Sequence, residues 1–211
     1  FRLAVREVAA MHNVHATFMP KPLEGVQGSG MHLHLSLFKG EENAFYDEKD
    51  AYNLSPTAKS FMAGLLRHAA EITAVTNQTV NSYKRLVPGF EAPVHISWAR
   101  NNRSGLIRVP VPKKGNAMAT RIEYRSPDPA TNPYLAFSVI LAAGLRGVEQ
   151  GYTLPTEADA NLFEMNDADL NKLSIEQLPQ SLADALDIME RSELVASALG
   201  EHIFEWFLRN K

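Results

Sequence analysis

The sequence contains no cysteine. Disulfide bonds and thiolate metal sites are therefore excluded, and any metal must be held by histidine, carboxylate and water. A secretory signal is also missing, because residues 1–18 distribute charges among their apolar side chains. The longest apolar run, residues 134–145, is too short to span a bilayer and predicts a buried helix. We therefore expect a cytoplasmic protein with no membrane partner.

Charge and length narrow the possibilities further. The formal net charge is −3 over 211 residues, which gives no reason to expect nucleic acid or an anionic membrane as a partner. The length is enough for one substantial domain with its own core. The chain does not begin with Met, and its first residues have the pattern of a helix without a capping residue. We therefore expect residues 1–211 to be part of a longer protein.

Hydrophobic periodicity predicts a mixture of helices and strands. Helices are expected over residues 1–12, 55–77, 132–147, 181–191 and 192–209, the first with Leu3, Val5, Val8 and Ala9 facing a core. Strands are expected over residues 15–22, 31–37, 94–99, 106–111 and 120–125, with a long loop over residues 81–93. Because helices do not alternate regularly with the strands, these elements indicate an α+β fold with a largely antiparallel sheet.

One predicted strand, within GSGMHLHLSL at residues 28–37, alternates strictly between apolar and polar side chains. Because side chains on a strand alternate between its two faces, one face is wholly apolar and the other carries His32, His34 and Ser36. Two imidazoles on one face are a common metal-binding geometry. On this pattern alone, a solvated or hydrogen-bonded pair is about equally consistent with the sequence.

A second strand, TRIEYR at residues 120–125, has the same design. Its apolar side chains point one way, whereas Arg121, Glu123 and Arg125 point the other. Taken alone, such a strand usually has its polar face in water. If the two strands share a sheet with their polar faces together, imidazoles, a carboxylate and guanidiniums meet on one surface, and these groups suit a divalent cation and a phosphate or carboxylate.

Further arginines lie between residues 85 and 125. Arg85 falls in the predicted loop beside Glu91, and RNNRSGLIR contributes Arg100, Arg103 and Arg108. The prolines that follow Arg108 predict an edge strand there. Each arginine alone is consistent with a solubilising surface charge, but their concentration in an acidic protein indicates an anion site for a polyphosphate, with ATP the leading candidate.

Four segments together carry a family resemblance. GSGMHLHLSL, NSYKRLVPGFEAP, RNNRSGLIRVP and RIEYRSPDPATNPYLAFSVILAAG follow one another in the order found in bacterial-type glutamine synthetases. The resemblance covers nearly the whole chain and implies that residues 1–211 are the C-terminal portion of that family's catalytic domain, in which helices pack on an antiparallel sheet that forms part of a half-barrel. It also implies homo-oligomeric, dodecamer-like rings.

The resemblance implies an activity and a set of ligands. The family joins ammonium to the γ-carboxylate of glutamate at the expense of ATP, through γ-glutamyl phosphate, with two divalent metals, Mg²⁺ or Mn²⁺. Position by position it implies the following roles: His32 and Glu123 as metal ligands; His34, Ser36, Arg103 and Arg121 at the nucleotide; Gly28, Arg85, Glu91 and Arg125 at glutamate; and Glu91, Arg103, Arg108 and Arg125 in catalysis. Glu91 matches a loop glutamate that closes the site and helps to deprotonate the attacking nitrogen.

Three departures from the family pattern matter. Gln27 stands where many members have Asn, and Phe163 stands where some carry a tyrosine that is adenylylated, so that control is expected to be absent. The upstream half of the family's sequence, with most of its metal-binding glutamates, is not in this chain, so the isolated chain is expected to be inactive. A γ-glutamyl ligase for a larger amine and a non-catalytic relative are the alternatives.

Overall fold

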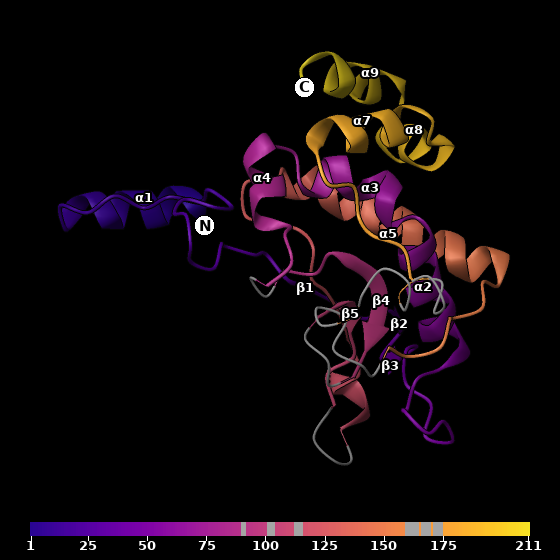
Figure 1. The fold of residues 1–211 in the computed structure, drawn as a ribbon. Helices are drawn as coiled ribbons and strands as arrows, with labels where there is room; N and C mark the ends of the chain where they lie inside the picture. Colours follow the sequence, from indigo (N-terminus) through magenta and orange to yellow (C-terminus); the bar gives the residue numbers. More distant parts are fainter. Residues whose placement is uncertain (90–91, 101–103, 112–115, 159–164, 166–169, 171–174) are drawn as a thin grey trace.

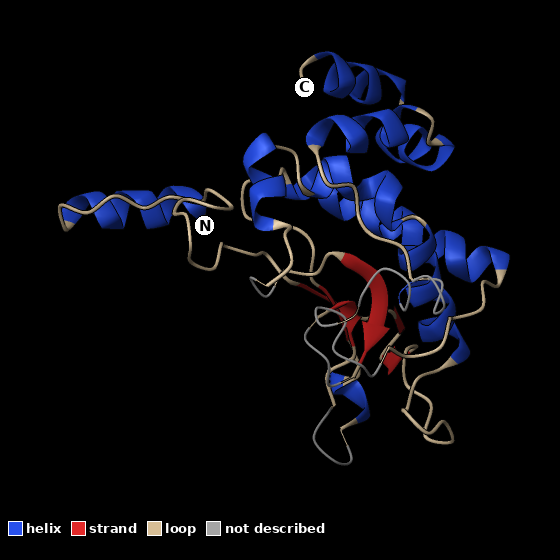
Figure 2. Ribbon diagram, in the orientation of Figure 1, coloured by secondary structure: helices blue, strands red, loops and turns tan. Residues whose placement is uncertain are grey.

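The computed structural model describes residues 1–89, 92–100, 104–111, 116–158, 165, 170 and 175–211. Its centre is a four-stranded sheet in the order β1-β6-β5-β4, with helices packed on one face (Figures 1 and 2). The strands are β1 (Leu33–Leu35), β4 (His95–Ala99), β5 (Gly105–Arg108) and β6 (Ile122–Tyr124), and a small hairpin is formed by β2 (Phe38–Lys39) and β3 (Glu42–Asn43). The expected α+β fold is confirmed.

The sheet is mainly antiparallel but has one parallel pair. β1 and β5 both run antiparallel to β6, whereas β4 runs parallel to β5. The prediction that Arg108 lies on an edge strand is wrong, because β5 is paired on both sides. The prolines mark the end of this strand rather than an edge, since β5 stops at Arg108 and Pro110 follows outside it.

The two edges of the sheet differ. Backbone groups on both sides of a gap in the described chain bond to β4: Ile96 N–H donates to Glu176 O at 2.8 Å, and Ala158 N–H donates to Trp98 O at 3.0 Å. On the other side β1 is the terminal strand, and no strand in the described ranges pairs with its outer edge. The sheet is therefore covered at β4 and open at β1.

The apolar face of the sheet is covered by a stack of helices. These are α2 (Pro56–Arg67), α3 (Ala69–Thr76) and α5 (Pro133–Gln150), with α7 (Leu182–Glu190), α8 (Glu193–Leu199) and α9 (Glu201–Arg209) further out (Figure 1). Ser55 and Asn132 cap α2 and α5, each followed by a proline at the first helical position, as the sequence predicts. The helix expected over residues 55–77 is divided at His68 into α2 and α3.

α2 and α5 approach each other through glycines. A Cβ atom built on Gly64 would lie 2.3 Å from the carbonyl oxygen of Ala143, and one on Gly147 would lie 2.1 Å from that of Ser60. A Cβ on Gly144 would lie 2.2 Å from the ring of Phe61. Real Cβ atoms do not reach such distances, so these glycines let the two backbones touch and seal the core above the sheet.

Several predicted elements differ from the observed ones. Residues 81–93 were expected to form a loop, but α4 (Val80–Arg85) occupies the beginning of this segment, started by a capping box between Thr79 and Ser82. Residues 15–22 form no strand. The helix expected over residues 192–209 is split into α8 and α9 at Gly200, which has φ +75°.

The first helix, α1 (Arg2–Met11), forms where expected, but the prediction that its apolar side chains face a core is wrong. None of its residues is buried, and Leu3 is 73% exposed. α1 stands away from the helices and the sheet (Figure 1). No helix among the described residues is long and apolar enough to cross a membrane.

Candidate active site

The two alternating strands do pair, as their patterns predict. In the β1–β6 ladder His34 lies opposite Glu123, and in the β6–β5 ladder Arg108 lies opposite Glu123. These three side chains therefore form a row across the sheet, on the face away from the apolar core that takes Ile122 and Tyr124. The expected meeting of imidazole, carboxylate and guanidinium on one surface is confirmed.

Glu123 is the centre of this row. Its side chain is only 7% exposed; one carboxylate oxygen lies 2.8 Å from His32 Nδ1, and the other accepts a hydrogen bond from Arg108 Nε. Burial raises the pKa of the Glu123 carboxyl, but the hydrogen bonds from Arg108 and His32 outweigh burial and hold the pKa below its ordinary value. Glu123 is therefore a carboxylate at neutral pH.

The pKa of His32 is lowered, whereas an ion pair with a carboxylate ordinarily raises the pKa of a histidine. Burial lowers the pKa of its imidazole, the hydrogen bond with Glu123 opposes this, and the nearby charge of Arg125 lowers the pKa further. The net pKa lies below the usual histidine value, so the ring is neutral at neutral pH. With Nδ1–H donating to the carboxylate, Nε2 keeps a lone pair, which is the form that binds metal.

The space around Nε2 depends on Gly30. A Cβ atom on Gly30 would lie 3.2 Å from His32 Nε2 and 2.6 Å from an Nη atom of Arg85, so glycine keeps this space open. The donor chemistry suits a divalent cation at His32 Nε2. For His32 and Glu123 to bind one cation directly, their mutual hydrogen bond must be given up. The described residues hold no cluster of three or more metal-type side chains, so a cation here would need further ligands.

Three of the residues predicted at the nucleotide, His34, Ser36 and Arg121, lie along the exposed side of β1. Arg121 Nε donates to His34 Nδ1 at 3.2 Å, and an Nη atom of Arg121 donates to Ala119 O at 3.1 Å. Ser36 follows β1 and is exposed. Because His34 belongs to the Glu123 row, the Arg121–His34 pair extends this row on its exposed β1 side, where a ligand can reach it.

Arg85, predicted at the glutamate substrate, is 3% exposed at the end of α4. One Nη atom donates to Ser126 O at 2.7 Å, and the other donates to Arg125 O at 3.3 Å. Burial lowers the pKa of Arg85 to about 10, although Asp128 opposes the change. The aliphatic part of the Arg85 side chain packs against Gly28, where a Cβ atom would lie 3.1 Å from Arg85 Cγ. Arg85 therefore clamps the chain after β6 beneath the glycine-rich segment.

A carboxyl group that the sequence analysis did not single out supports this clamp. Asp128 is fully buried, and its oxygens accept from Ala130 N–H at 2.9 Å and from Asn77 Nδ2 at 3.1 Å. Asn77 Nδ2 also donates to Ser126 O, the same oxygen that accepts from Arg85. The sequence predicts that a helix starts at Asn132, but no sequence signal shows that Asp128 meets residues about 50 positions earlier.

The remaining predicted residues are placed differently. Arg125 follows β6, is 6% exposed, and donates through Nη1 to Gly105 O at 3.4 Å. Gln27 is exposed. Glu91, Arg103 and Phe163 lie outside the described residues.

Comparisons with known proteins agree with the motifs. The family model for the catalytic domain of glutamine synthetase matches residues 1–211. A glutamine synthetase of Mycolicibacterium smegmatis is 55% identical over 211 residues, and one of Thermotoga maritima is 52% identical over 207 residues. The chain is fully covered by the first and covers 47% of it, so it spans about half the length of these curated relatives.

Comparison with solved structures agrees with the sequence comparison. A structure described as a GmaS/ADP complex superimposes with a TM-score of 0.87 at 38% identity, over 100% of this chain and 47% of that one. Apo GmaS without ligand gives a TM-score of 0.85 at 39% identity. With sequence match, fold and motif order in agreement, the chain belongs to the glutamine synthetase catalytic-domain family.

Proposed function

We propose that the chain is the C-terminal portion of an ATP-dependent glutamate–ammonia ligase. In this reaction the γ-carboxylate of glutamate attacks the γ-phosphorus of ATP, ADP leaves, and ammonia then displaces phosphate from γ-glutamyl phosphate to give glutamine. The observation that carries the proposal is Glu123, bonded to both His32 and Arg108 on the polar face of the sheet, in a chain of this family.

His32 and Glu123 are the residues that would hold Mg²⁺ or Mn²⁺, and their neutral imidazole and ionised carboxylate are the forms that metal binding requires. The metal supplies neutralisation of phosphate charge. The hydrogen bond and ion pair with Arg108 keep Glu123 ionised and its side chain fixed. Gly30 leaves His32 Nε2 accessible.

The arginines have distinct proposed tasks. Arg108, whose side chain is 35% exposed, is placed to move its hydrogen bonds from Glu123 to an oxygen of the transferred phosphoryl group. Arg121 and His34, with Ser36 nearby, form the proposed nucleotide contact. Arg85 and Arg125 place positive charge under the glycine-rich segment, where a glutamate carboxylate would bind. Glu91 and Arg103 keep the roles that their motif implies.

The whole protein is needed for turnover. His32 and Glu123 are two donors, and further ligands must come from elsewhere in the protein, as the relatives' additional length allows. We therefore propose that the isolated 211-residue chain is inactive and that the full-length protein works as a homo-oligomer of dodecamer-like rings, with glutamate, ammonium and ATP as substrates.

The test is glutamine formation by the full-length protein, followed with ¹⁵N-ammonium and by phosphate release, with methylamine, ethanolamine and a polyamine as competing acceptors. Glu123→Gln is expected to lower kcat by about 100-fold or more, since even loss of a ligand's hydrogen-bonding partner costs about 10- to 100-fold. Glu149→Gln, at an exposed position of α5, is the matched control and should keep full activity.

Three results would contradict the proposal. Absence of ATP-dependent glutamine formation by the full-length protein would refute the activity. Preference for a larger amine over ammonium would replace ammonium as the acceptor. Glutamine formation by the 211-residue chain alone would refute the inactivity of the fragment.

A further inference from the structure

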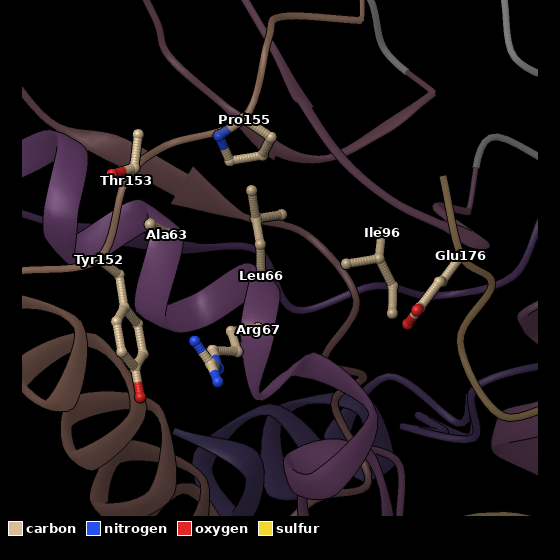
Figure 3. A pocket seen from close by; sticks show the side chains of 8 residues that line it. All are labelled: Ala63, Leu66, Arg67, Ile96, Tyr152, Thr153, Pro155 and Glu176. Carbon is tan, nitrogen blue, oxygen red and sulfur yellow. The ribbon is translucent and has the colours of Figure 1, made fainter. Parts of the chain in front are cut away.

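A cleft lies at the edge of the sheet opposite to the candidate active site. It is bounded by the last turn of α2, the segment that follows α5, and β4, with a volume of about 430 Å³ (Figure 3). This volume is within the usual range for small-molecule sites. The candidate site involves β1, β6 and β5 on the polar face of the sheet, whereas this cleft lies beside β4 and the helices that cover the apolar face.

The cleft has an apolar interior with fixed walls. Leu66, Ile96 and Pro155 supply its apolar surface. Trp98 Nε1 donates to Pro155 O at 2.7 Å, and the backbone of Ile96 donates to Glu176 O at 2.8 Å, so both flanking segments are tied to β4. The cavity therefore exists before any ligand arrives, which lowers the entropic cost of binding.

Arg67 provides a cation on one side. Its guanidinium carbon lies over the Tyr152 ring, 4.5 Å from the ring centroid, a cation–π contact that helps to hold the group in place. The carboxylate of Glu71 is engaged elsewhere, by His68 Nδ1 at 2.7 Å and by Ser192 Oγ. Arg67 makes no ion pair within the part of the chain that the structure describes.

Glu176 provides an anion on the other side. Its main chain is fixed by Ile96, but its carboxylate has no ion pair with any described residue and faces the cleft across the apolar surface from Arg67 (Figure 3). A guanidinium and a carboxylate separated by aliphatic side chains complement a molecule with the reverse arrangement.

We propose that this cleft is a second ligand site, which binds a small dipolar molecule. The ligand's carboxylate pairs with Arg67, its ammonium group pairs with Glu176, and a short aliphatic chain between them covers Leu66 and Ile96. The proposal is independent of the reaction at the Glu123 row, because none of the residues involved belongs to that row.

The experiment is a titration of the ¹⁵N-labelled 211-residue chain, followed by NMR and calorimetry, with 6-aminohexanoate as the dipolar probe. Hexanoate and hexylammonium carry one charge each, and 4-aminobutyrate tests the spacing. Because a hydrogen bond to a charged group contributes about 1.5–3 kcal/mol, each single-charge probe should bind at least about tenfold more weakly than the dipolar one. Shifts are expected at the Arg67 side chain and at Tyr152.

Two substitutions at exposed positions separate the charges. Arg67→Gln should weaken 6-aminohexanoate and hexanoate by about tenfold but leave hexylammonium unchanged, and Glu176→Gln should do the reverse for the single-charge probes. Arg146→Gln, at an exposed position of α5, is the matched control. The proposal is overturned if no probe binds, if the shifts appear only around His34 and Arg121, or if both variants bind the dipolar probe as tightly as the parent.

Discussion

Two opposing influences act on the buried carboxyl of Asp128, and Asp128→Asn measures which one wins. Hydrogen bonds from the Ser82 side chain, Ala130 N–H and Asn77 Nδ2 favour the ionised carboxylate, as does the positive charge of Arg85. Burial favours the protonated acid, and it is the larger effect, so the pKa of Asp128 lies above its ordinary value. The fold therefore tolerates this charge rather than gaining stability from it.

The sign of the pH dependence follows from that direction. A group whose pKa is higher in the folded state contributes stability fully below its unfolded pKa, about 3.9 for aspartate, and loses it as pH rises through the folded pKa. The Asn variant does not titrate at this position. The parent's free energy of unfolding should therefore fall relative to that of D128N as pH rises from about 4 through the raised folded pKa, by about 1.4 kcal/mol for each unit of raised pKa.

At low pH the parent should be the more stable of the two by about 1 kcal/mol, because the variant's NH₂ group would face the Asn77 amide in place of the oxygen that accepts from Asn77 Nδ2. Urea unfolding followed by the fluorescence of Trp98 and Trp206 measures the difference at each pH. Asp187→Asn, at an exposed position of α7, corrects for the general effect of losing one carboxylate. An advantage of the parent over D128N that grows as pH rises would refute the reasoning and show that Arg85 and the hydrogen bonds stabilise the charge more than burial opposes it.

Three further substitutions have defined outcomes. Gly144→Ala would place Cβ 2.2 Å from a buried phenylalanine ring of α2 and should cost about 1–3 kcal/mol in urea unfolding, whereas Gly105→Ala, with its nearest contact at 3.4 Å, avoids this clash and should cost less. Gly28→Ala would place Cβ 2.3 Å from a carbonyl oxygen, so a similar loss is expected in the same assay. Burial raises the pKa of Glu71, but hydrogen bonds from the adjacent histidine and from Ser192 outweigh it, so the advantage of the parent over Glu71→Gln should disappear as pH falls below about 4.3. Unchanged stability of either clashing glycine variant, or a Glu71 difference independent of pH, would contradict these expectations.

Local patterns were sufficient to predict the centre of the candidate site. Strict alternation in the two strands determines which side chains share a face, and a one-residue error would exchange the faces. His32, His34 and Glu123 consequently lie on the face that alternation in these two strands predicts, opposite Ile122 and Tyr124. Arg108 joins them from β5, which the prolines had indicated as an edge strand. Alternation alone does not distinguish a face that lines an active site from one that faces solvent. The order of the family motifs favours the active site.

Long-range packing could not be predicted in the same way. Arg85 was expected in a loop, but a capping box places it at the end of a short helix, buried against carbonyl groups that follow β6. Asp128 meets Asn77 across a separation of 51 residues. The apolar periodicity of residues 1–12 correctly predicts the helix α1. It does not show whether another element packs against the apolar side of this helix, and Leu3 is exposed.

The unpaired edge of β1 is the place where a further strand could add side chains to the candidate site. At β4 residues 158 and 176 already bond to Trp98 and Ile96, so among the described residues the edge left for a further strand is the one beside β1. Its side chains would then alternate over the same two faces, and every second one would project next to His32 and His34. Joining another strand and supplying further ligands would thus be a single event, and occupancy of the metal site would be linked to protection of the β1 backbone from hydrogen exchange.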